Sequence, residues 1–533
     1  MANLIDITNS ILAENTISFD LREINTEDVS IPIEDAKFGI LNFKAVTCNE
    51  NTSELDLLFV IDCSGSMSDI CSDNRTKMQH IIHTLKNMIM FFYERPNIKV
   101  NITVNAFDTK IYKIINRTKI TKDNFTNIID KIDKISPRGS TNIEFALQKS
   151  AEEILKLKNE YPRNSINHIF MTDGEATDGS KDINVLQNLI DSNVTNSFIG
   201  FGIDHDDALL NGICSVNKSA YYFIDKLESA GLVYGEILHS IVYKLLTDVE
   251  INIENGLIYN YKNNTWEHTL HIGDIVSESN KTFNIATDNI DECKVNIKGT
   301  LENLVILFPS TLIENSDLSI HIYRQRTLQL LYDVNQFNKH KREIDIENSY
   351  NFFNRETIVQ ENLISEKQNN LKLKMKNLLE EIKTYMTDNN LNDNKILKNL
   401  CDDIYICYRT FGTRYGSMFC TARQTSQGTQ RQYTVSNTNE ITENLYGNRQ
   451  IPGLNTPTLR RQTNNIYRFS DENLTDDEPF DLPELSHTIS NFQDTPYLTP
   501  QATQVMREIS RGFIYNNDEL DDEHISVFTQ EII

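Results

Sequence analysis

Three oxygen-bearing side chains alternate along one short segment of the chain. Asp62, Ser64 and Ser66 directly follow the apolar run 57–61, whose sequence is LLFVI. Hard divalent cations such as Mg²⁺ bind carboxylate, hydroxyl and water oxygens, and they need no sulfur or imidazole ligand. The segment therefore predicts a site for a hard cation and does not favour zinc.

Two other segments carry oxygen side chains at comparable positions. Thr141 lies in the sequence RGSTN at 138–142, which enters a predicted helix, and Asp173 follows the apolar run 168–171. Open α/β sheets bind ligands at the carboxyl ends of their strands, where the loops gather. We therefore expect the oxygen side chains of the three loops to converge.

An α/β unit would position these loops. Between residues 56 and 246, short apolar runs alternate with amphipathic stretches of helical length, which is typical of a parallel sheet covered on both faces. The pattern predicts a doubly wound, mostly parallel, Rossmann-like sheet. We expect strands at 57–61, 100–104, 168–171 and 195–200, and helices at 76–93, 123–134, 142–158, 182–192, 206–214 and 226–246.

The ordered set of DxSxS, Gly-Ser-Thr-Asn and Thr-Asp-Gly resembles the metal-ion-dependent adhesion site of von Willebrand factor A (vWA) domains. The resemblance extends over residues 55–246, and we expect the domain at 51–247. It implies a bound Mg²⁺ or Mn²⁺ with one coordination position open to an Asp or Glu of a partner protein. The implied metal ligands are Asp62, Ser64, Ser66, Thr141 and Asp173.

The neighbours of these ligands form the expected rim of the partner-binding site. Asp204 and His205 belong to the sequence GFGIDHD, which resembles the loop after the next strand in intracellular members of the family. The segment 68–75 is longer than the turn usual in the family, and we interpret it as a surface loop, with gating of the metal as the alternative. The expected rim is Gly65, Met67, Asn142, Gly174, Asp204 and His205.

The segments on either side of the α/β unit alternate polar and apolar residues as half-buried strands do. We expect 31–50 and 248–317 to form one small antiparallel β-sandwich, with a turn at 272–274, into which the α/β unit is inserted. This arrangement resembles intracellular vWA proteins of the ubiquitin-ligase-associated type. Cysteine and histidine spacing typical of a RING domain is absent from the sequence, so ligase chemistry is not expected.

The remaining chain divides into a helical region and a polar tail. Apolar residues recur every three or four positions from 371 to 386, which predicts a long helix at 363–386, and further helices are expected at 318–335 and 394–410. We expect the helical region at 318–420, a disordered polar and acidic tail at 421–533 and an N-terminal segment at 1–30. Within the tail, 499–514 has helical spacing and is interpreted either as a partner-binding helix or as part of a solubilising tail.

The composition limits the class of partner and the compartment. The chain has 533 residues and a net charge of −25, which argues against nucleic acid or an anionic membrane as the main partner. We detect no signal peptide or membrane span, and the eight cysteines show no CxxC pair, so we expect an intracellular, cytoplasmic protein. The abundance of Asn, Ile and Lys is typical of an A/T-rich genome, such as that of a protist or a large DNA virus.

Three other functions were weighed against metal-dependent binding. An enzyme would use Ser64 or Ser66 as nucleophile with His80 or His83 as base, but the Gly-x-Ser-x-Gly elbow is missing, so we expect no catalysis. A scaffold would bind partners through the helical region and tail and keep the metal as an incidental feature. An RNA-associated protein would use the arginines at 409–461 as a local basic patch. The oligomeric state stays open.

Overall fold

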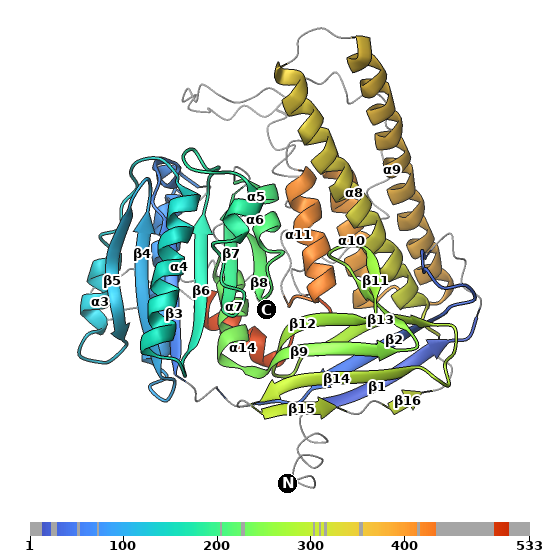
Figure 1. The fold of residues 1–533 in the computed structure, drawn as a ribbon, viewed down its shortest axis with the longest axis horizontal. Helices are drawn as coiled ribbons and strands as arrows, with labels where there is room; N and C mark the ends of the chain where they lie inside the picture. The colour runs from blue at the N-terminus through green and yellow to red at the C-terminus, as the bar shows by residue number, and fades with distance from the viewer. Residues whose placement is uncertain are drawn as a thin grey trace, which may run out of the picture.

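The computed structural model describes residues 13–22, 29–48, 50, 54–71, 74–202, 205–224, 230–301, 304–308, 311–313, 317–350, 355–412, 416–432 and 495–510. Three parts are visible in Figure 1. A sheet flanked by helices forms one part, two further sheets form the second, and long helices rise from the second beside the first.

A six-stranded sheet forms the centre of the α/β domain, in the order β5-β4-β3-β6-β7-β8. Neighbouring strands are parallel except for β5, which runs antiparallel to β4. The predicted doubly wound, mostly parallel sheet is therefore confirmed. Its strands are β3 (Leu55–Asp62), β4 (Val100–Phe107), β5 (Ile111–Lys119), β6 (Ser165–Thr172), β7 (Thr195–Phe201) and β8 (Ser219–Ile224).

Helices cover both faces of the sheet because successive side chains of a strand point to opposite sides. Leu57 and Phe59 pack in one core, and Leu58 and Val60 pack in the other. Burying each such side chain contributes roughly 1.5–3 kcal/mol. The helices are the 3-10 turn η1 (Gly65–Ser68), α2 (Lys77–Tyr93), α3 (Phe125–Ile132), α4 (Ile143–Glu160), α5 (Ile183–Gln187), α6 (Asp207–Ile213) and α7 (Ala230–Val242).

Three features of this domain differ from the sequence-based expectation. The edge strands β5 and β8 were not predicted, because β5 mixes polar and apolar residues and β8 is a short run between two predicted helices. Helix α5 is shorter than the predicted 182–192. The helix expected at 226–246 ends at Val242, and a strand begins at Lys244, because the apolar residues around this junction suit both structures.

Two sheets outside the α/β domain enclose the next core. One has the order β11-β10-β13-β2-β1-β16 and the other β12-β9-β14-β15. Strand β2 precedes the α/β domain in sequence and pairs with β13, which follows it, so the domain is inserted between strands of this sandwich. The strands are β1 (Ala13–Asp20), β2 (Lys37–Ala45), β9 (Lys244–Glu254), β10 (Leu257–Asn260), β11 (Thr265–Glu267), β12 (Thr269–Val276), β13 (Asn280–Thr287), β14 (Lys294–Leu301), β15 (Leu304–Phe308) and β16 (Thr311–Ile313).

Two expectations for the sandwich were wrong. The turn predicted at 272–274 lies inside β12, where Gly273 adopts a positive φ of 80° and the pairing with β9 shifts register. Glycine favours such a bulge, so its presence marked an irregular strand and not a reversal of the chain. The segment 1–30 was given no structure, yet β1 pairs along its whole length with β2.

Long helices form the third part. The predicted stripe on α9 (Arg355–Asp388) is confirmed, because its apolar residues are buried against α8 (Ser319–Tyr350) and α10 (Lys395–Thr410). The boundary at 420 was wrong: α11 (Gly416–Thr429) crosses it and buries the guanidinium of Arg423 between Asp402 and Asp403 of α10. Within the described residues, each helix lacks the combination of length and apolar character needed to span a membrane.

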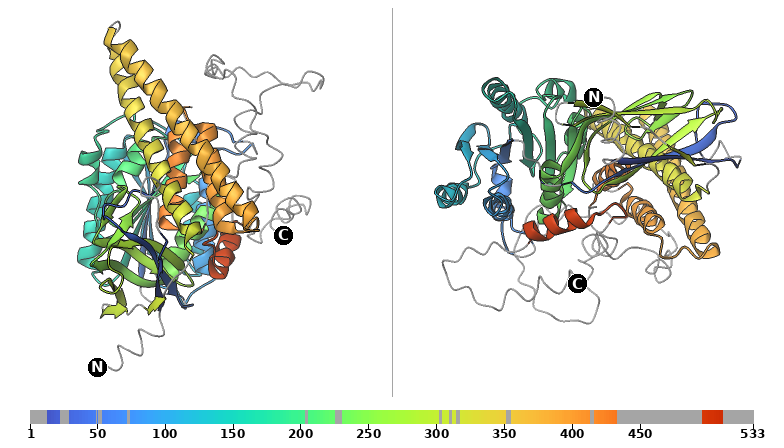
Figure 2. Two further views of the ribbon diagram at one scale, coloured as in Figure 1. Left: turned by 90° about the vertical axis from the view of Figure 1, so that its right-hand side faces the viewer. Right: turned by 90° about the horizontal axis from the view of Figure 1, so that it is seen from below.

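The helix predicted in the tail is present and packs on the chain itself. Helix α14 (Pro500–Ser510) lies against α7 and α2, as Figure 2 shows from below. The rest of the predicted disordered tail, 433–494 and 511–533, lies outside the described residues. The eight cysteines all lie in described parts of the chain, and no disulfide joins any of them.

Candidate metal centre

Asp62 ends β3, the strand that lies between β4 and β6 in the sheet. Its carboxylate is completely buried. It accepts hydrogen bonds from the backbone N–H of Ser64 at 2.8 Å and from the hydroxyl of Thr172 at 2.6 Å. Because Thr172 ends the neighbouring strand β6, the two parallel strands together fix the orientation of the carboxylate.

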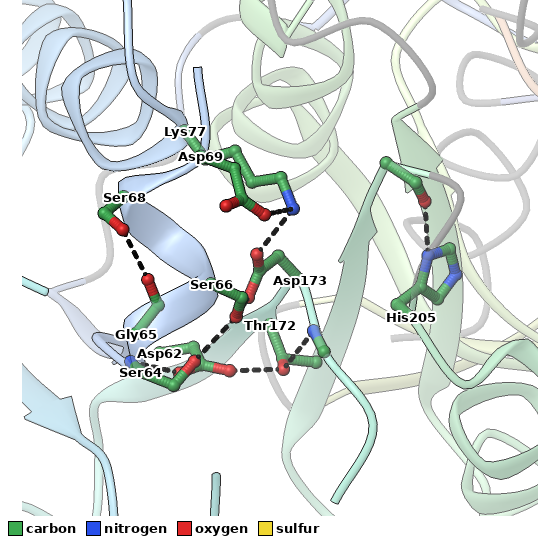
Figure 3. A network of polar contacts seen from close by, with 12 residues as sticks. Asp62, Ser64, Gly65, Ser66, Ser68, Asp69, Lys77, Thr172, Asp173 and His205 are labelled. Carbon is green, nitrogen blue, oxygen red and sulfur yellow. Dashed lines mark hydrogen bonds and ion pairs between the residues drawn. The ribbon is translucent and has the colours of Figure 1, made fainter. Parts of the chain in front are cut away.

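Hydroxyl groups connect this strand end to a second carboxylate (Figure 3). The Ser64 and Ser66 hydroxyl oxygens lie 3.1 Å apart, and the Ser66 hydroxyl donates to Asp173 Oδ1 at 2.8 Å. Ser64 and Asp173 are buried, whereas Ser66 is half-buried. Ser66 sits in the turn η1, so the turn after β3 presents its oxygen toward the loop after β6.

A third loop brings Thr141 to the same place. The N–H of Gly65 donates to the carbonyl of Gly139 at 3.1 Å, which ties this loop to the turn after β3. A Cβ added to Gly174 would lie 3.5 Å from Thr141 Oγ1 and 3.7 Å from Ser66 Oγ, so both hydroxyls face this glycine. The structure thus brings together the five side chains that were singled out from three separate loops.

Gly139 shows why the loop before Thr141 requires a glycine. Its φ is +68°, a conformation that L side chains rarely adopt. A Cβ at this position would also lie 2.7 Å from Asp108 Oδ2. The backbone N–H of Asn142 donates to the Asp108 carbonyl, and the Asn142 side chain accepts from the N–H of Phe145 to cap α4. The loop is therefore held from both ends, with Thr141 between them.

The electrostatics of the site are dominated by two buried acidic groups. Burial raises the pKa of Asp62 to about 6, and the neighbouring Asp173 carboxylate adds to the rise, whereas the hydrogen bonds from Thr172 and Ser64 oppose it. The ammonium of Lys77 donates to Asp173 Oδ2 at 2.8 Å. This ammonium offsets the charge of Asp173 in a region with little exposure to water.

This donor set fits a hard divalent cation, because it offers carboxylate and hydroxyl oxygens, which suit Mg²⁺ or Mn²⁺. It contains two carboxylates, and a cluster of three or more His, Cys, Asp or Glu placed to hold a metal is absent from the described residues. The raised pKa of Asp62 means that ionising this carboxyl is costly without a compensating positive charge. A cation bound between the loops would supply that charge.

The residues expected at the rim of the site differ in how the structure places them. Gly65 is exposed and Gly174 is half-buried, so both border the site. Met67 is fully buried in the core, so its side chain does not line the surface of the site. Asn142 is half-buried, and its side-chain oxygen caps α4. His205 is also buried, because its ring bonds to the Gly202 carbonyl and the Tyr221 hydroxyl and lies apart from the polar network (Figure 3). Asp204 lies outside the described residues.

Three polar residues of the site were not singled out from the sequence. Thr172 precedes the predicted ligand Asp173, and its hydroxyl holds Asp62. Lys77 and Asp69 lie at the two ends of the long loop 68–75, and their side chains are 3.3 Å apart. The unusual length of that loop was a usable signal, but the contact between Lys77, which follows the loop, and Asp173 depends on tertiary folding.

Comparisons with known proteins identify a von Willebrand factor A domain in this chain. A family model, the von Willebrand factor type A domain, matches residues 56–235. A von Willebrand factor A domain-containing protein of Dictyostelium discoideum is 25% identical over 217 residues, which are 40% of this chain but only 22% of that protein.

Solved structures with a similar fold include two proteins of prokaryotes. The ArnB paralogue VWA2 of Sulfolobus acidocaldarius matches with a TM-score of 0.45 and 15% identity, covering 78% of this chain and 97% of that chain. A von Willebrand factor type A protein of Catenulispora acidiphila matches with a TM-score of 0.41 and 13% identity, covering 61% and 80%. On the family match and the doubly wound sheet, residues 56–235 of this chain form a von Willebrand factor type A domain.

Proposed function

We propose that this chain binds a partner protein through a divalent cation held by Asp62, Ser64, Ser66, Thr141 and Asp173. A vWA domain supports a role in protein interaction or adhesion in general. The observation that carries the finer proposal is the convergence of two buried carboxylates and three hydroxyls from three loops at one edge of the sheet.

Charge gives the physical reason for a cation at this edge. The Asp173 carboxylate contributes to the raised pKa of Asp62, because like charges repel. Asp62 and Asp173 are both fully buried, so water screens this repulsion poorly. A divalent ion would offset the repulsion and would also attract a negative group from outside.

The partner group that suits such an ion is a carboxylate. Mg²⁺ favours octahedral coordination by oxygen and retains several waters in protein sites, so a water position can be exchanged for an Asp or Glu oxygen. The exposed Gly65 and the half-buried Gly174 present no side chain beyond hydrogen at the edge of the site. An acidic side chain could therefore approach without displacing a bulky residue.

Metal titration followed by partner capture tests the proposal. Mn²⁺ and Mg²⁺ should bind the wild-type chain in calorimetry, and Asp62→Asn should weaken the binding at least about tenfold because it removes one of the two ligand charges. Partner capture from the native cell should occur in Mg²⁺ and be lost in EDTA. Asp182→Asn is the matched control, because Asp182 is an exposed cap of α5 in the same domain.

The scaffold function makes the opposite prediction. If the helical region recruits the partner and the metal is incidental, capture should be equal in Mg²⁺ and in EDTA and unaffected by Asp62→Asn. Capture that weakens with added salt but not with EDTA would instead favour an RNA-associated role. Either result would contradict metal-dependent binding.

A further inference from the structure

The ammonium of Lys77 pairs with Asp173, one of the two buried carboxylates of the proposed metal site. Its ammonium donates to Asp173 Oδ2 at 2.8 Å, while the other oxygen of that carboxylate accepts from Ser66 at 2.8 Å (Figure 3). The Lys77 side chain is 10% exposed, and the side chain of Asp173 is 0% exposed. The ion pair is therefore shielded from water. Charge interactions are stronger in such a shielded region than in water.

The local structure holds Lys77 in this position. Lys77 is the first residue of α2, and Thr76 before it caps the helix in a capping box with Gln79. The backbone N–H of Lys77 donates to the Asp69 carbonyl at 3.0 Å, and Ile70 pairs with Thr76, which closes the long loop. These contacts fix the backbone of Lys77. The long loop 68–75 therefore helps to direct the ammonium toward Asp173.

Asp69 provides a second partner for the same ammonium. Its carboxylate lies 3.3 Å from Lys77 Nζ, and its side chain is 60% exposed, in contrast to Asp173. The ammonium is thus shared between a buried carboxylate of the metal centre and an exposed carboxylate outside it. A small movement would transfer Lys77 from the first to the second without leaving it unpaired.

We infer that Lys77 is a tethered cation that competes with the divalent ion for Asp173, and that Asp69 receives its ammonium when the divalent ion binds. This inference rests on the proposed metal site. Without the ion, Lys77 neutralises one charge of the site. With the ion, Lys77 adds a like charge beside it, so the affinity of the site for metal is lower than its oxygen donors alone would give. The long loop therefore sets how much cation the site needs before it can bind a partner.

Removing the ammonium should strengthen metal binding. In the full chain, Lys77→Met keeps most of the side-chain volume and should raise the affinity for Mn²⁺, measured by calorimetry or by electron paramagnetic resonance, by roughly tenfold. Lys86→Met is the matched control. It lies on the same helix and pairs with Asp133, so its removal should leave the affinity unchanged.

Asp69 should act in the opposite direction and only through Lys77. Asp69→Asn should weaken Mn²⁺ binding in the wild-type background, because the ammonium then has Asp173 as its nearer acidic partner. In the Lys77→Met background the same substitution should have no further effect, which a double-mutant cycle detects. Equal effects of Asp69→Asn in both backgrounds would show that Asp69 acts as a general surface charge and would overturn its assigned role.

Thermal unfolding supplies a readout that does not depend on a partner. Without metal, Lys77→Met should lower Tm, because the buried Asp173 loses its counter-charge, and Mg²⁺ should then raise Tm by more than it does in the wild type. If wild type binds Mn²⁺ and Lys77→Met binds it no more tightly, the competition is refuted while the metal site stands. If only Lys77→Met binds Mn²⁺, the competition is supported and the resident metal of the wild type is refuted. If neither binds, both proposals fail.

Discussion

The candidate metal centre and the surface that receives α14 are built on the same domain from different kinds of contact. At the metal centre, oxygen atoms from three loops face one another, and their arrangement depends on charge and hydrogen bonds. At the α14 contact, Val505, Met506 and Ile509 are buried in the core that α2 and α7 also form. The first surface should therefore respond to ions, and the second should respond to side-chain volume.

Glycines on α7 allow α14 to approach closely. A Cβ on Gly235 would lie 2.5 Å from Met506 Cα, and one on Gly231 would lie 2.8 Å from Ser510 Cα. The side-chain amide of Asn87 donates to the Ile509 carbonyl at 2.8 Å, and Arg95 pairs with Glu508 at 2.6 Å. The polar contacts thus lie at the end of an interface whose centre is set by packing.

The largest expected effect tests whether acid lowers stability through a group outside the candidate metal centre. His168 lies in β6, the strand that leads to Thr172, and burial lowers the pKa of its imidazole to about 4. A folded-state pKa below the unfolded value of 6.5 gives stability that is present above pH 6.5 and is lost as pH falls toward 4. The loss should approach about 3 kcal/mol, from about 1.4 kcal/mol per pKa unit.

Urea unfolding at pH 7 and at pH 4.5 measures this loss. Wild type should lose more stability between the two pH values than His168→Gln, because the variant has no buried imidazole to protonate. An equal loss in both proteins would show that His168 does not account for the acid sensitivity. The acid sensitivity would then have to come from titratable groups other than His168.

The next effect tests the contact that depends on volume. Gly235→Leu should detach α14, because overpacking costs about 1–3 kcal/mol, or roughly 5- to 150-fold in the docking equilibrium. Hydrogen exchange of the amides at 500–510 should speed up accordingly, while Mn²⁺ affinity stays unchanged. Ser240→Leu adds the same side chain at a half-buried position of α7 and should leave the protection of α14 intact. Full protection in Gly235→Leu would contradict the importance of close packing.

The sequence made these two surfaces visible to different degrees. The convergence of the oxygen side chains was predicted because two of their motifs follow strands and the third enters a helix, at the edge where a parallel sheet gathers its loops. The helix at α14 was also predicted from its spacing, but its partner was not. Met506 meets Gly235, which lies 271 positions earlier in the chain, and no pattern in the sequence relates the two residues. The same limit applies to Lys77, whose contact with Asp173 joins a helix start to a loop after another strand.

Edge strands and chain ends account for most of the other differences. The core strands β3, β6 and β7 were predicted, because β3 is a nearly continuous apolar run and β6 and β7 contain shorter apolar runs. Strand β5 carries polar residues on a face that packs only in part, and β1 carries buried polar residues among its apolar ones, so the patterns of both strands resemble those of loops. Helix α11 was missed because its Ser, Thr and Gln residues are typical of disordered segments, yet here they hydrogen-bond within the fold, as Gln427 does with Asp403.

The smallest expected effect tests whether the candidate metal centre and the α14 contact are independent, although both involve α2. Thr76 caps α2 beside Lys77, whereas Asn87 and Arg95 reach α14 from the far half of that helix and just beyond it. Thr76→Ala removes the oxygen that accepts from the N–H of Gln79 at 3.2 Å, so stability should fall by about 1 kcal/mol. Helix ends fray locally, so the loss should free Lys77 and leave α14 in place.

Hydrogen exchange along α2 and α14 measures this separation, with Thr76→Ser as the control that restores the cap. Amides of the first turn of α2 should exchange faster in Thr76→Ala, and those at 500–510 should exchange at the wild-type rate. Faster exchange in both places would mean that α2 transmits the change along its length as one rigid body. The metal centre and the α14 contact would then be coupled, and an ion at one surface would be expected to alter helix docking at the other.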